Sequence, residues 1–311
     1  MRLIVTGAEG FVGGHLLPHL LRRGHQVTGT YLAAHPDIEG VAWIQTDLIS
    51  PQSVSALVNA AQPDGVIHLA AISHVPAVQA DPGRAFAANV TGLVHLLSAC
   101  TGSAETVVIV STGEVYGSVS PQRLPICEGE PIAPRNLYGV TKACSEQVAR
   151  YFGRIGGLHP TVVRPFSQMG PGQPDTFVTS SFARQIARIA LGKSPPRVRV
   201  GNLTVRRDFM DVRDVVSAYT MLAESHAGQG PFNVCTGRSV SIGHILDTLI
   251  ALSGHEIQVQ VDPARIRPTD IENMVGDPSA FYQATGWEPT LSIEQSLRDI
   301  LQFWLTREGG G

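Results

Sequence analysis

The sequence predicts an α/β protein with a doubly wound parallel sheet and a smaller C-terminal lobe, and two observations lead to this prediction. Short apolar strand patterns alternate with helical patterns through the first half of the chain, which is typical of a parallel sheet covered on both faces. The 311 residues, 43% of them hydrophobic, are also enough to bury one large core and a second, smaller one.

The first strand pattern, residues 3–6, leads directly into a glycine-rich turn. Glycine recurs every third residue at Gly7, Gly10 and Gly13, and a helical pattern follows. Glycines at these positions permit a tight turn, let the backbone approach a pyrophosphate, and let the helix pack closely on its strand. The turn therefore predicts a Rossmann-type dinucleotide-binding site, in preference to a glycine turn with only a structural role.

Five further strands of the sheet are expected along the chain. They are predicted at residues 25–30, 41–45, 65–70, 106–110 and 160–164, with helices at 51–61 and 84–100. Ligands of such a sheet bind beyond the carboxyl ends of its strands. Asp47, Ala70, Thr112 and Arg164 fall at these ends, so we expect them near the binding site.

The pattern changes after Pro165, where clusters of glycine and proline at residues 170–174 and 192–196 frame a helix at about 179–191. We expect a dinucleotide-binding domain and a smaller lobe, followed by a disordered tail at residues 309–311. The domain is predicted at 1–166 plus about 209–254, and the lobe at about 167–208 plus 255–285.

Composition excludes several classes of partner. A net charge of -3 and a pI of about 6.4 give no global attraction to nucleic acid or to acidic membranes. No apolar run reaches the roughly 18 residues that a membrane span needs. The four cysteines lie far apart without metal-ligand spacing, so we expect reduced thiols, no metal and a cytoplasmic protein.

Tyr138 and Lys142 lie four residues apart in a helical pattern. On a helix this spacing places both side chains on one face, about 6 Å apart in rise. A cation beside a phenol lowers the phenol pKa toward the range in which it can exchange a proton at neutral pH. An amphipathic surface helix would explain the pair equally well if it stood alone.

Together these motifs resemble the extended short-chain dehydrogenase/reductase family of nucleotide-sugar epimerases, dehydratases and reductases, over nearly the whole chain. The matching segments are 6–13, 47–48, 68–71, 89–92, 111–117, 138–142, 164–166 and 207–212. Within that family, segments 164–173, 177–178, 233–237 and 262–265 are most similar to GDP-6-deoxy-4-keto-D-mannose reductases.

The resemblance implies a role for each matching residue. Tyr138 exchanges a proton with the reacting sugar oxygen, Thr112 hydrogen-bonds that oxygen, and Lys142 binds the nicotinamide ribose and lowers the tyrosine pKa. The implied cofactor-binding residues are Gly7, Gly10, Phe11, Val12, Gly13, Asp47, Leu48, Leu69, Ala70, Ala71, Asn89, Tyr138 and Lys142. The implied substrate-binding residues are Ser73, Glu114, Ser167, Gln168, Val178, Arg184, Asn202, Arg207 and Arg267.

Arginine suits a diphosphate because its guanidinium binds two oxygens at once, and the resemblance assigns that task to Arg207 and Arg267. Structural alternatives stay open at two other positions. Thr112 could cap the turn that follows it, and Asp47 could cap the helix after Pro51.

Gly113 bears on the type of reaction. Dehydratases of this family carry a general acid and a general base directly after the threonine, whereas Gly113 has no proton to donate, although Glu114 remains. Hydride transfer to a ketone needs neither group, so a ketoreductase is favoured over a 4,6-dehydratase. A 4-epimerase that uses the same three residues is the alternative enzyme, and a non-catalytic nucleotide-binding protein is a further one.

The cofactor is expected to be NADPH, with NADH also used. No carboxylate stands at the end of the second strand, since residues 29–33 are uncharged and Asp37 lies well past them. That absence removes repulsion against a 2′-phosphate, but no arginine follows to bind one.

The substrate is expected to be a GDP-linked 4-keto-6-deoxyhexose, reduced at C4, for instance GDP-4-keto-6-deoxy-D-mannose to GDP-D-rhamnose. Relatives carry an asparagine where this chain has Ser167 and Gln168, which weakens the prediction of guanosine. The resemblance also implies a homodimer that forms through the helix of Tyr138 and the helix at 84–100.

Overall fold

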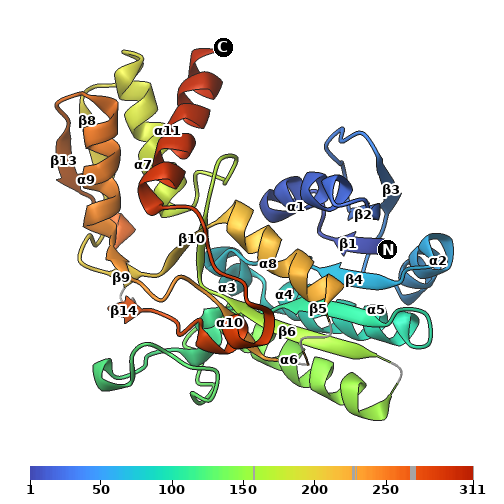
Figure 1. Cartoon of the computed structure of the whole chain (residues 1–311). Helices are drawn as coiled ribbons and strands as arrows, with labels where there is room; N and C mark the ends of the chain where they lie inside the picture. The colour runs from blue at the N-terminus through green and yellow to red at the C-terminus, as the bar shows by residue number, and fades with distance from the viewer. Residues whose placement is uncertain (157, 226–227, 229, 267–270, 311) are drawn as a thin grey trace.

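The structure, a computed structural model of the chain, describes residues 1–156, 158–225, 228, 230–266 and 271–310. A parallel sheet of seven strands lies at its centre, in the order β11-β6-β5-β4-β1-β2-β3 (Figure 1). The strands are β1 Arg2–Thr6, β2 Gln26–Tyr31, β3 Val41–Gln45, β4 Gly65–His68, β5 Thr106–Val110, β6 His159–Pro165 and β11 Phe232–Val234. The predicted doubly wound parallel sheet is confirmed, and β11 is a strand that the sequence analysis missed.

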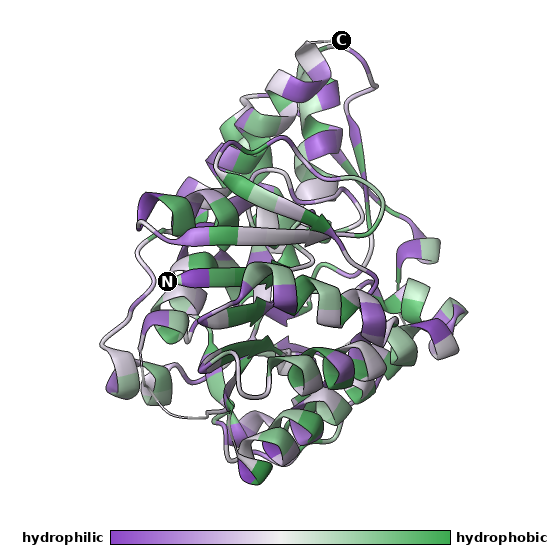
Figure 2. Cartoon of the chain, turned by 90° about the vertical axis from the view of Figure 1, so that its right-hand side faces the viewer, coloured by the Kyte–Doolittle hydropathy of each residue, from purple (hydrophilic) through white to green (hydrophobic). Residues whose placement is uncertain are grey.

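Helices cover both faces of this sheet because its strands are apolar on both sides. Alternate residues of a strand point to opposite faces, and neighbouring residues of β1 follow this rule. Leu3 and Val5 belong to one buried cluster, whereas Ile4 belongs to another. Figure 2 shows the central strands coloured largely as hydrophobic, while the helices around them carry both colours. A sheet apolar on both faces needs two helical layers, which is the pattern that its sequence predicted.

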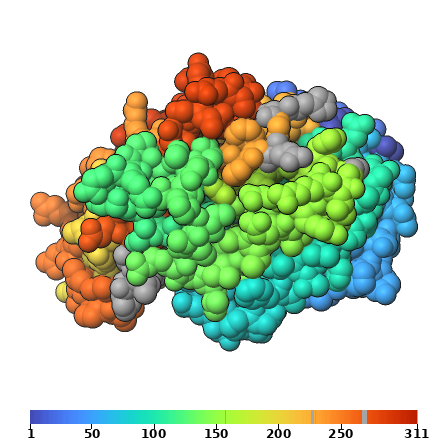
Figure 3. Space-filling view, turned by 90° about the horizontal axis from the view of Figure 1, so that it is seen from below, coloured from blue at the N-terminus to red at the C-terminus, as the bar shows by residue number. Residues whose placement is uncertain are grey.

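One layer contains α2 Pro51–Ala61, α5 Gly92–Cys100 and α6 Leu137–Ile155. Local sequence fixes where two of these helices begin: Ser50 caps α2, and Asn136 caps α6. In the view of Figure 3, the yellow-green surface of α6 borders the teal surface of the helices that precede it.

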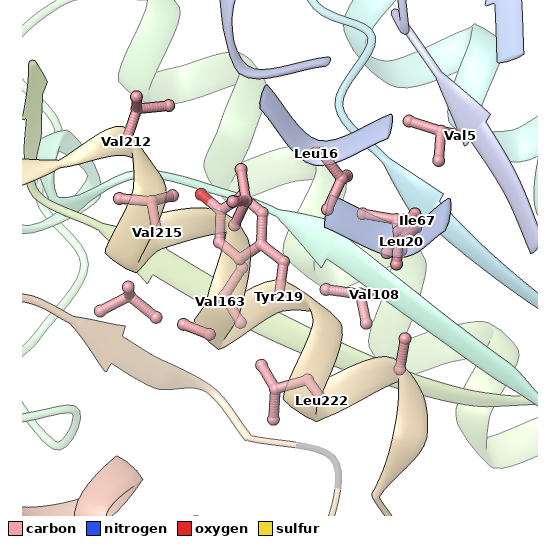
Figure 4. Close-up of a cluster of buried hydrophobic side chains, with 14 of the residues drawn as sticks. Val5, Leu16, Leu20, Ile67, Val108, Val163, Val212, Val215, Tyr219 and Leu222 are labelled. Carbon is pink, nitrogen blue, oxygen red and sulfur yellow. The ribbon is translucent and has the colours of Figure 1, made fainter. Parts of the chain in front are cut away.

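The other layer contains α1 Phe11–Arg22 and α8 Val212–Glu224, which pack against each other and against the sheet. Figure 4 shows Leu16 of α1 and Val215 and Tyr219 of α8 in one cluster with strand residues Val108 and Val163. Asp211 begins α8 by accepting a hydrogen bond from the Arg213 amide.

The helix predicted at 84–100 is interrupted. The chain forms α3 Val75–Ala80, α4 Pro82–Phe86, a π-helical turn η1 Ala87–Thr91, and then α5. A π-helical turn inserts an extra residue into a helix and is often found at functional sites. Here Asn89 lies within the turn, and its side chain binds the backbone of Ile72.

The smaller lobe has its own apolar core, built from α7 Val178–Ala190, α9 Ile242–Ser253 and α11 Ile293–Gly309 with strands β8 Arg197–Val200 and β13 Gln258–Val261. Figure 1 shows these elements together on the side away from the N-terminus. The division expected from the sequence differs at α9. We expected residues 209–254 to return to the sheet, and α8 and β11 do, but α9 buries Ile245 and Leu249 against the lobe. Gly309, expected in a frayed tail, is the last residue of α11, because the helix continues to a hydrogen bond from Gly310 to Thr306.

Short elements connect the two parts of the molecule. They are η2 Gly113–Tyr116, η3 Pro121–Arg123, β7 Ser167–Met169, β9 Arg206–Arg207, β10 Phe209–Asp211, β12 Val240–Ser241, η4 Pro263–Arg265, β14 Asn273–Met274 and α10 Ser279–Thr285. β7 pairs with β10, and β9 lies between β12 and β14. In the part of the chain that the structure describes, no helix has the length and apolarity to cross a membrane.

Candidate active site

A cavity of about 1500 Å³ lies beyond the carboxyl ends of β1, β4 and β5 and reaches the smaller lobe at α7 and η4. The strand order reverses between β1 and β4, which is where ligands bind in sheets of this type. The structure describes every predicted site residue except Arg267, which lies outside the described residues. Of those it describes, only Asn89 does not line the cavity.

The glycine turn closes one side of the cavity and fits a bound pyrophosphate. Gly7 has φ of 65°, and a Cβ there would lie 2.7 Å from the Cα of Ala70. A Cβ on Gly13 would lie 2.2 Å from the carbonyl oxygen of Ala8. Gly10 starts α1 without a side-chain cap, so backbone amides of the first turn remain available to a ligand phosphate.

Asp47 and Leu48 line the far end of the cavity, beyond β3. The carboxylate of Asp47 accepts a hydrogen bond from the amide of Ile49 at 2.9 Å. Ser50, and not Asp47, caps α2 by accepting from the Ser53 amide at 3.3 Å. The alternative that Asp47 caps this helix is therefore wrong. Asp47 is exposed and lines the cavity.

Thr112, Tyr138 and Lys142 meet where β5 ends and α6 begins. Tyr138 and Lys142 occupy the first two turns of α6, and the Thr112 hydroxyl lies near enough to Tyr138 to lower the pKa of the phenol. The same hydroxyl accepts from the Glu114 amide at 3.2 Å, so Thr112 both caps its own turn and faces the phenol. The three residues that the sequence grouped by resemblance therefore lie together in the cavity wall.

Burial sets the protonation of this group. It raises the pKa of Tyr138, the charge of Glu114 raises it further, and the Thr112 hydrogen bond opposes this. Burial lowers the pKa of Lys142 to about 8. The expectation that Lys142 lowers the tyrosine pKa is not met, because burial dominates and the Lys142 ammonium donates to the Val110 carbonyl at 2.7 Å.

Asn136 fixes the start of α6. Its side-chain oxygen accepts from the Gly139 amide at 2.8 Å, and its amide nitrogen donates to the carboxylate of Glu114 at 2.9 Å. In sequence, Tyr138 lies between Asn136 and Gly139, which this hydrogen bond joins. The cap therefore holds Glu114 and the first turn of α6 in one arrangement.

Asn89 acts from behind the cavity wall. Its side chain accepts from the Ile72 amide at 2.8 Å and donates to the Ile72 carbonyl at 3.1 Å and to the Thr141 hydroxyl at 3.0 Å. It therefore clamps the loop after β4 to α6, whereas the resemblance placed it among the cofactor-binding residues. Arg164 is also withdrawn from the cavity, in a buried ion pair with Glu146.

The described residues that the resemblance assigns to the substrate all line the cavity: Ser73, Glu114, Ser167, Gln168, Val178, Arg184, Asn202 and Arg207. Arg184 pairs with Asp175 at 2.5 Å and with Glu308 at 2.7 Å, so much of its charge is already compensated. Arg207 lines the cavity and donates to the carbonyl of Ile271 at 2.6 Å. The amide of Gln168 donates to the Tyr219 hydroxyl at 3.2 Å.

Comparison with known proteins identifies the family. A family model described as GDP-mannose 4,6 dehydratase matches residues 4–300. The chain belongs to this family. It is 38% identical over 308 residues to a protein of Pseudomonas aeruginosa, GDP-6-deoxy-D-mannose reductase, and the match covers 98% of each chain.

Solved structures agree with this membership of the GDP-mannose 4,6 dehydratase family. The Pseudomonas aeruginosa protein RMD, solved in complex with NADPH, has a TM-score of 0.87 at 36% identity, covering 99% of this chain and 100% of that one. A UDP-glucose 4-epimerase of Thermus thermophilus, in complex with NAD, has a TM-score of 0.88 at 29% identity, covering 98% and 99%. The resemblance predicted from the sequence is confirmed.

Tyr219, Arg265 and Glu9 are among the cavity residues that were not predicted from the sequence. Tyr219 looked like part of an apolar helix face, and only the fold brings its hydroxyl to the cavity beside Gln168. Arg265 lies in a segment that was recognised only as a family marker. Glu9 lies between Gly7 and Gly10, and only the glycines of this turn were interpreted from the sequence. The Glu9 carboxylate accepts a hydrogen bond from the Leu32 amide.

Proposed function

We propose that this protein is an NADPH-dependent 4-ketoreductase that converts GDP-4-keto-6-deoxy-D-mannose to GDP-D-rhamnose, with NADH also used. The observation that carries the proposal is the position of Tyr138 and Thr112, which lie together in the wall of a cavity that also includes the glycine turn. A reduced nicotinamide bound in this cavity would supply the hydride. The Pseudomonas aeruginosa relatives, a GDP-6-deoxy-D-mannose reductase and a structure complexed with NADPH, support the substrate and the cofactor.

Tyr138 would act as the general acid. Its raised pKa keeps the phenol protonated at neutral pH, ready to donate to an oxygen that gains negative charge during reduction. The Thr112 hydroxyl, which lines the cavity beside Tyr138, would orient that oxygen. Oxidation of an alcohol needs the phenolate instead, which is the form that a 4-epimerase would use in its first step.

Gly113 supports reduction over dehydration. A Cβ on Gly113 would lie 3.4 Å from the Phe166 ring, an ordinary van der Waals contact, so the backbone would accept a side chain here. The chain nevertheless places no acid directly after Thr112. Glu114, the remaining carboxylate of this turn, is held by Asn136.

The diphosphate of the substrate would lie at the rim formed by Arg207. Lys142, whose ammonium donates a hydrogen bond to the Val110 carbonyl, would bind the nicotinamide ribose. Asp47 and Leu48 would meet the adenine, as the resemblance implies for these positions.

The decisive experiment is anaerobic incubation with NADPH and GDP-, dTDP-, UDP- and CDP-linked 4-keto-6-deoxy sugars. We expect stoichiometric oxidation of NADPH with the GDP sugar, and NMR of the product should show the configuration of GDP-D-rhamnose at C4. Turnover without net loss of NADPH would indicate an epimerase. Inactivity with every keto sugar would overturn the proposal.

We also propose that the enzyme forms a homodimer through α6 and α5. Tyr151 and Ile155 on α6 are large apolar residues with 59% and 58% of their surface exposed. Leu93, Leu96 and Leu97 on α5 are buried in the core of the monomer. Light scattering of the native protein and of a Tyr151→Asp/Ile155→Asp variant should show dimer and monomer, respectively.

A further inference from the structure

A carboxylate reaches the end of β2, although β2 and the five residues directly after it, 32–36, supply none. Glu9 extends from the glycine turn, and its Oε1 accepts a hydrogen bond from the backbone amide of Leu32 at 3.3 Å. Leu32 directly follows Tyr31, the last residue of β2. Glu9, Tyr31 and Leu32 all line the cavity.

This position matters because the end of β2 meets the adenosine ribose in sheets of this type. A carboxylate there accepts a hydrogen bond from the 2′-hydroxyl of NADH, whereas the 2′-phosphate of NADPH needs a positive charge. Among the described residues, the cations that line the cavity all come from elements after β4: Arg84, Lys142, Arg184, Arg188, Arg207 and Arg265. The loops after β1, β2 and β3 therefore bring two carboxylates, Glu9 and Asp47, to the cavity, and no cation.

We infer that Glu9 is a specificity-determining residue that sets the balance between the two cofactors. Its carboxylate accepts from the 2′-hydroxyl of NADH and repels the 2′-phosphate of NADPH, so it makes NADH a competent cofactor and weakens NADPH. The inference rests on the proposed nicotinamide site. It concerns binding of the adenosine half only, which lies apart from the proton transfer at Tyr138.

The test is the dissociation constant of NADPH and of NADH for the full chain, measured by quenching of protein fluorescence without any sugar present. Glu9→Gln removes the charge but keeps an oxygen that can accept from Leu32. We expect NADPH to bind about tenfold more tightly to this variant, while NADH binds equally or somewhat more weakly. The gain should shrink at high salt, because it arises from charge repulsion near the surface.

Asp37→Asn is the matched control. Asp37 also follows β2 and is exposed, but it does not line the cavity. An unchanged ratio of the two constants in Glu9→Gln, or an equal change in Asp37→Asn, would overturn the inference. If circular dichroism shows that Glu9→Gln is misfolded, the two dissociation constants are measured for Glu9→Ser and judged by the same criteria. Wild-type protein that binds neither cofactor would instead overturn the proposed function itself, a result that the ratio cannot mimic.

Discussion

Arg164 and Glu146 form a two-pronged ion pair in the interior, directly behind the strand end that carries Thr112. The guanidinium donates to both carboxylate oxygens, at 2.9 and 2.6 Å, and each side chain is only 2% exposed. Glu146 also accepts from the Ser111 hydroxyl at 2.6 Å, and Arg164 donates to the Tyr116 hydroxyl at 2.9 Å. The pair therefore joins β6 and α6 to the residue that precedes Thr112, and supports this corner of the cavity from behind.

Removing one partner of this pair should destabilise the protein strongly. Arg164→Met leaves the Glu146 carboxylate buried without its counter-charge, and such losses cost about 3–5 kcal/mol of unfolding free energy. Urea unfolding monitored by circular dichroism measures the change. The double variant Arg164→Met/Glu146→Leu should recover much of the loss, since no lone charge remains. A double variant as unstable as the single one would show that the charge is not the cause.

Two adjacent glycines of α1 should respond in opposite ways to alanine. At Gly13 the new Cβ would meet the Ala8 carbonyl at 2.2 Å, so the turn must shift, at a cost of about 1–3 kcal/mol and a weaker affinity for NADPH. At Gly14 nothing lies within 4 Å, and Gly14→Ala should stabilise the helix by up to about 1 kcal/mol. Thermal unfolding with and without NADPH separates the two. Equal changes in thermal stability and in NADPH affinity for the two variants would contradict the close packing of Gly13 on Ala8.

Much of the fold was readable from the sequence because local patterns and tertiary packing agree there. β3 at Val41–Gln45, β5 at Thr106–Val110 and α2 at Pro51–Ala61 have the bounds that their apolar patterns predicted. The missed strand, β11, is three residues long, and its side chains alone do not distinguish it from a turn. α9 was assigned to the wrong core because an apolar helix face shows that a helix is buried, but not against which partner.

The site shows the same limit at the level of single residues. The glycine turn and Thr112 could be predicted because each follows the end of a strand, and Tyr138 because it lies four residues before Lys142 in a helical pattern. Glu9 could not, because its effect depends on a contact across the sheet, from the turn after β1 to the residue after β2. The tyrosine pKa also followed burial, which a helical spacing of four residues does not reveal.

Stability should depend on pH through Lys142. Its pKa falls from 10.5 in the unfolded chain to about 8 in the folded protein, because burial disfavours the charged form. Between these values the unfolded state binds more protons, so stability rises with pH from about 8 to about 10.5. At about 1.4 kcal/mol for each pKa unit, the total rise is up to about 3 kcal/mol.

The variant Lys142→Met isolates this contribution, because other groups titrate alike in both proteins. The difference in unfolding free energy between wild type and variant should narrow as the pH rises through this window. Lys193 is the only other lysine in the chain and is exposed, so Lys193→Met serves as the control, with a constant difference. Parallel curves for wild type and Lys142→Met would mean that Lys142 is not the buried, destabilised cation described here.

Replacing Tyr138 with phenylalanine should remove the general acid without disturbing the cavity. The variant loses only the hydroxyl, so kcat with the GDP 4-keto sugar should fall about 10²–10⁴-fold, the usual contribution of a positioned proton donor. NADPH affinity should change little, because the ring still packs in place. Tyr219 provides a matched control, since it is a second buried phenol that lines the same cavity, with its pKa also raised by burial and its hydroxyl bonded to Gln168. Tyr219→Phe should cost less than about tenfold in kcat, because its hydroxyl would lie outside the proton path. Comparable losses of kcat in the two variants would mean that the cavity needs both phenols for its shape. The assignment of Tyr138 as the general acid would then be wrong.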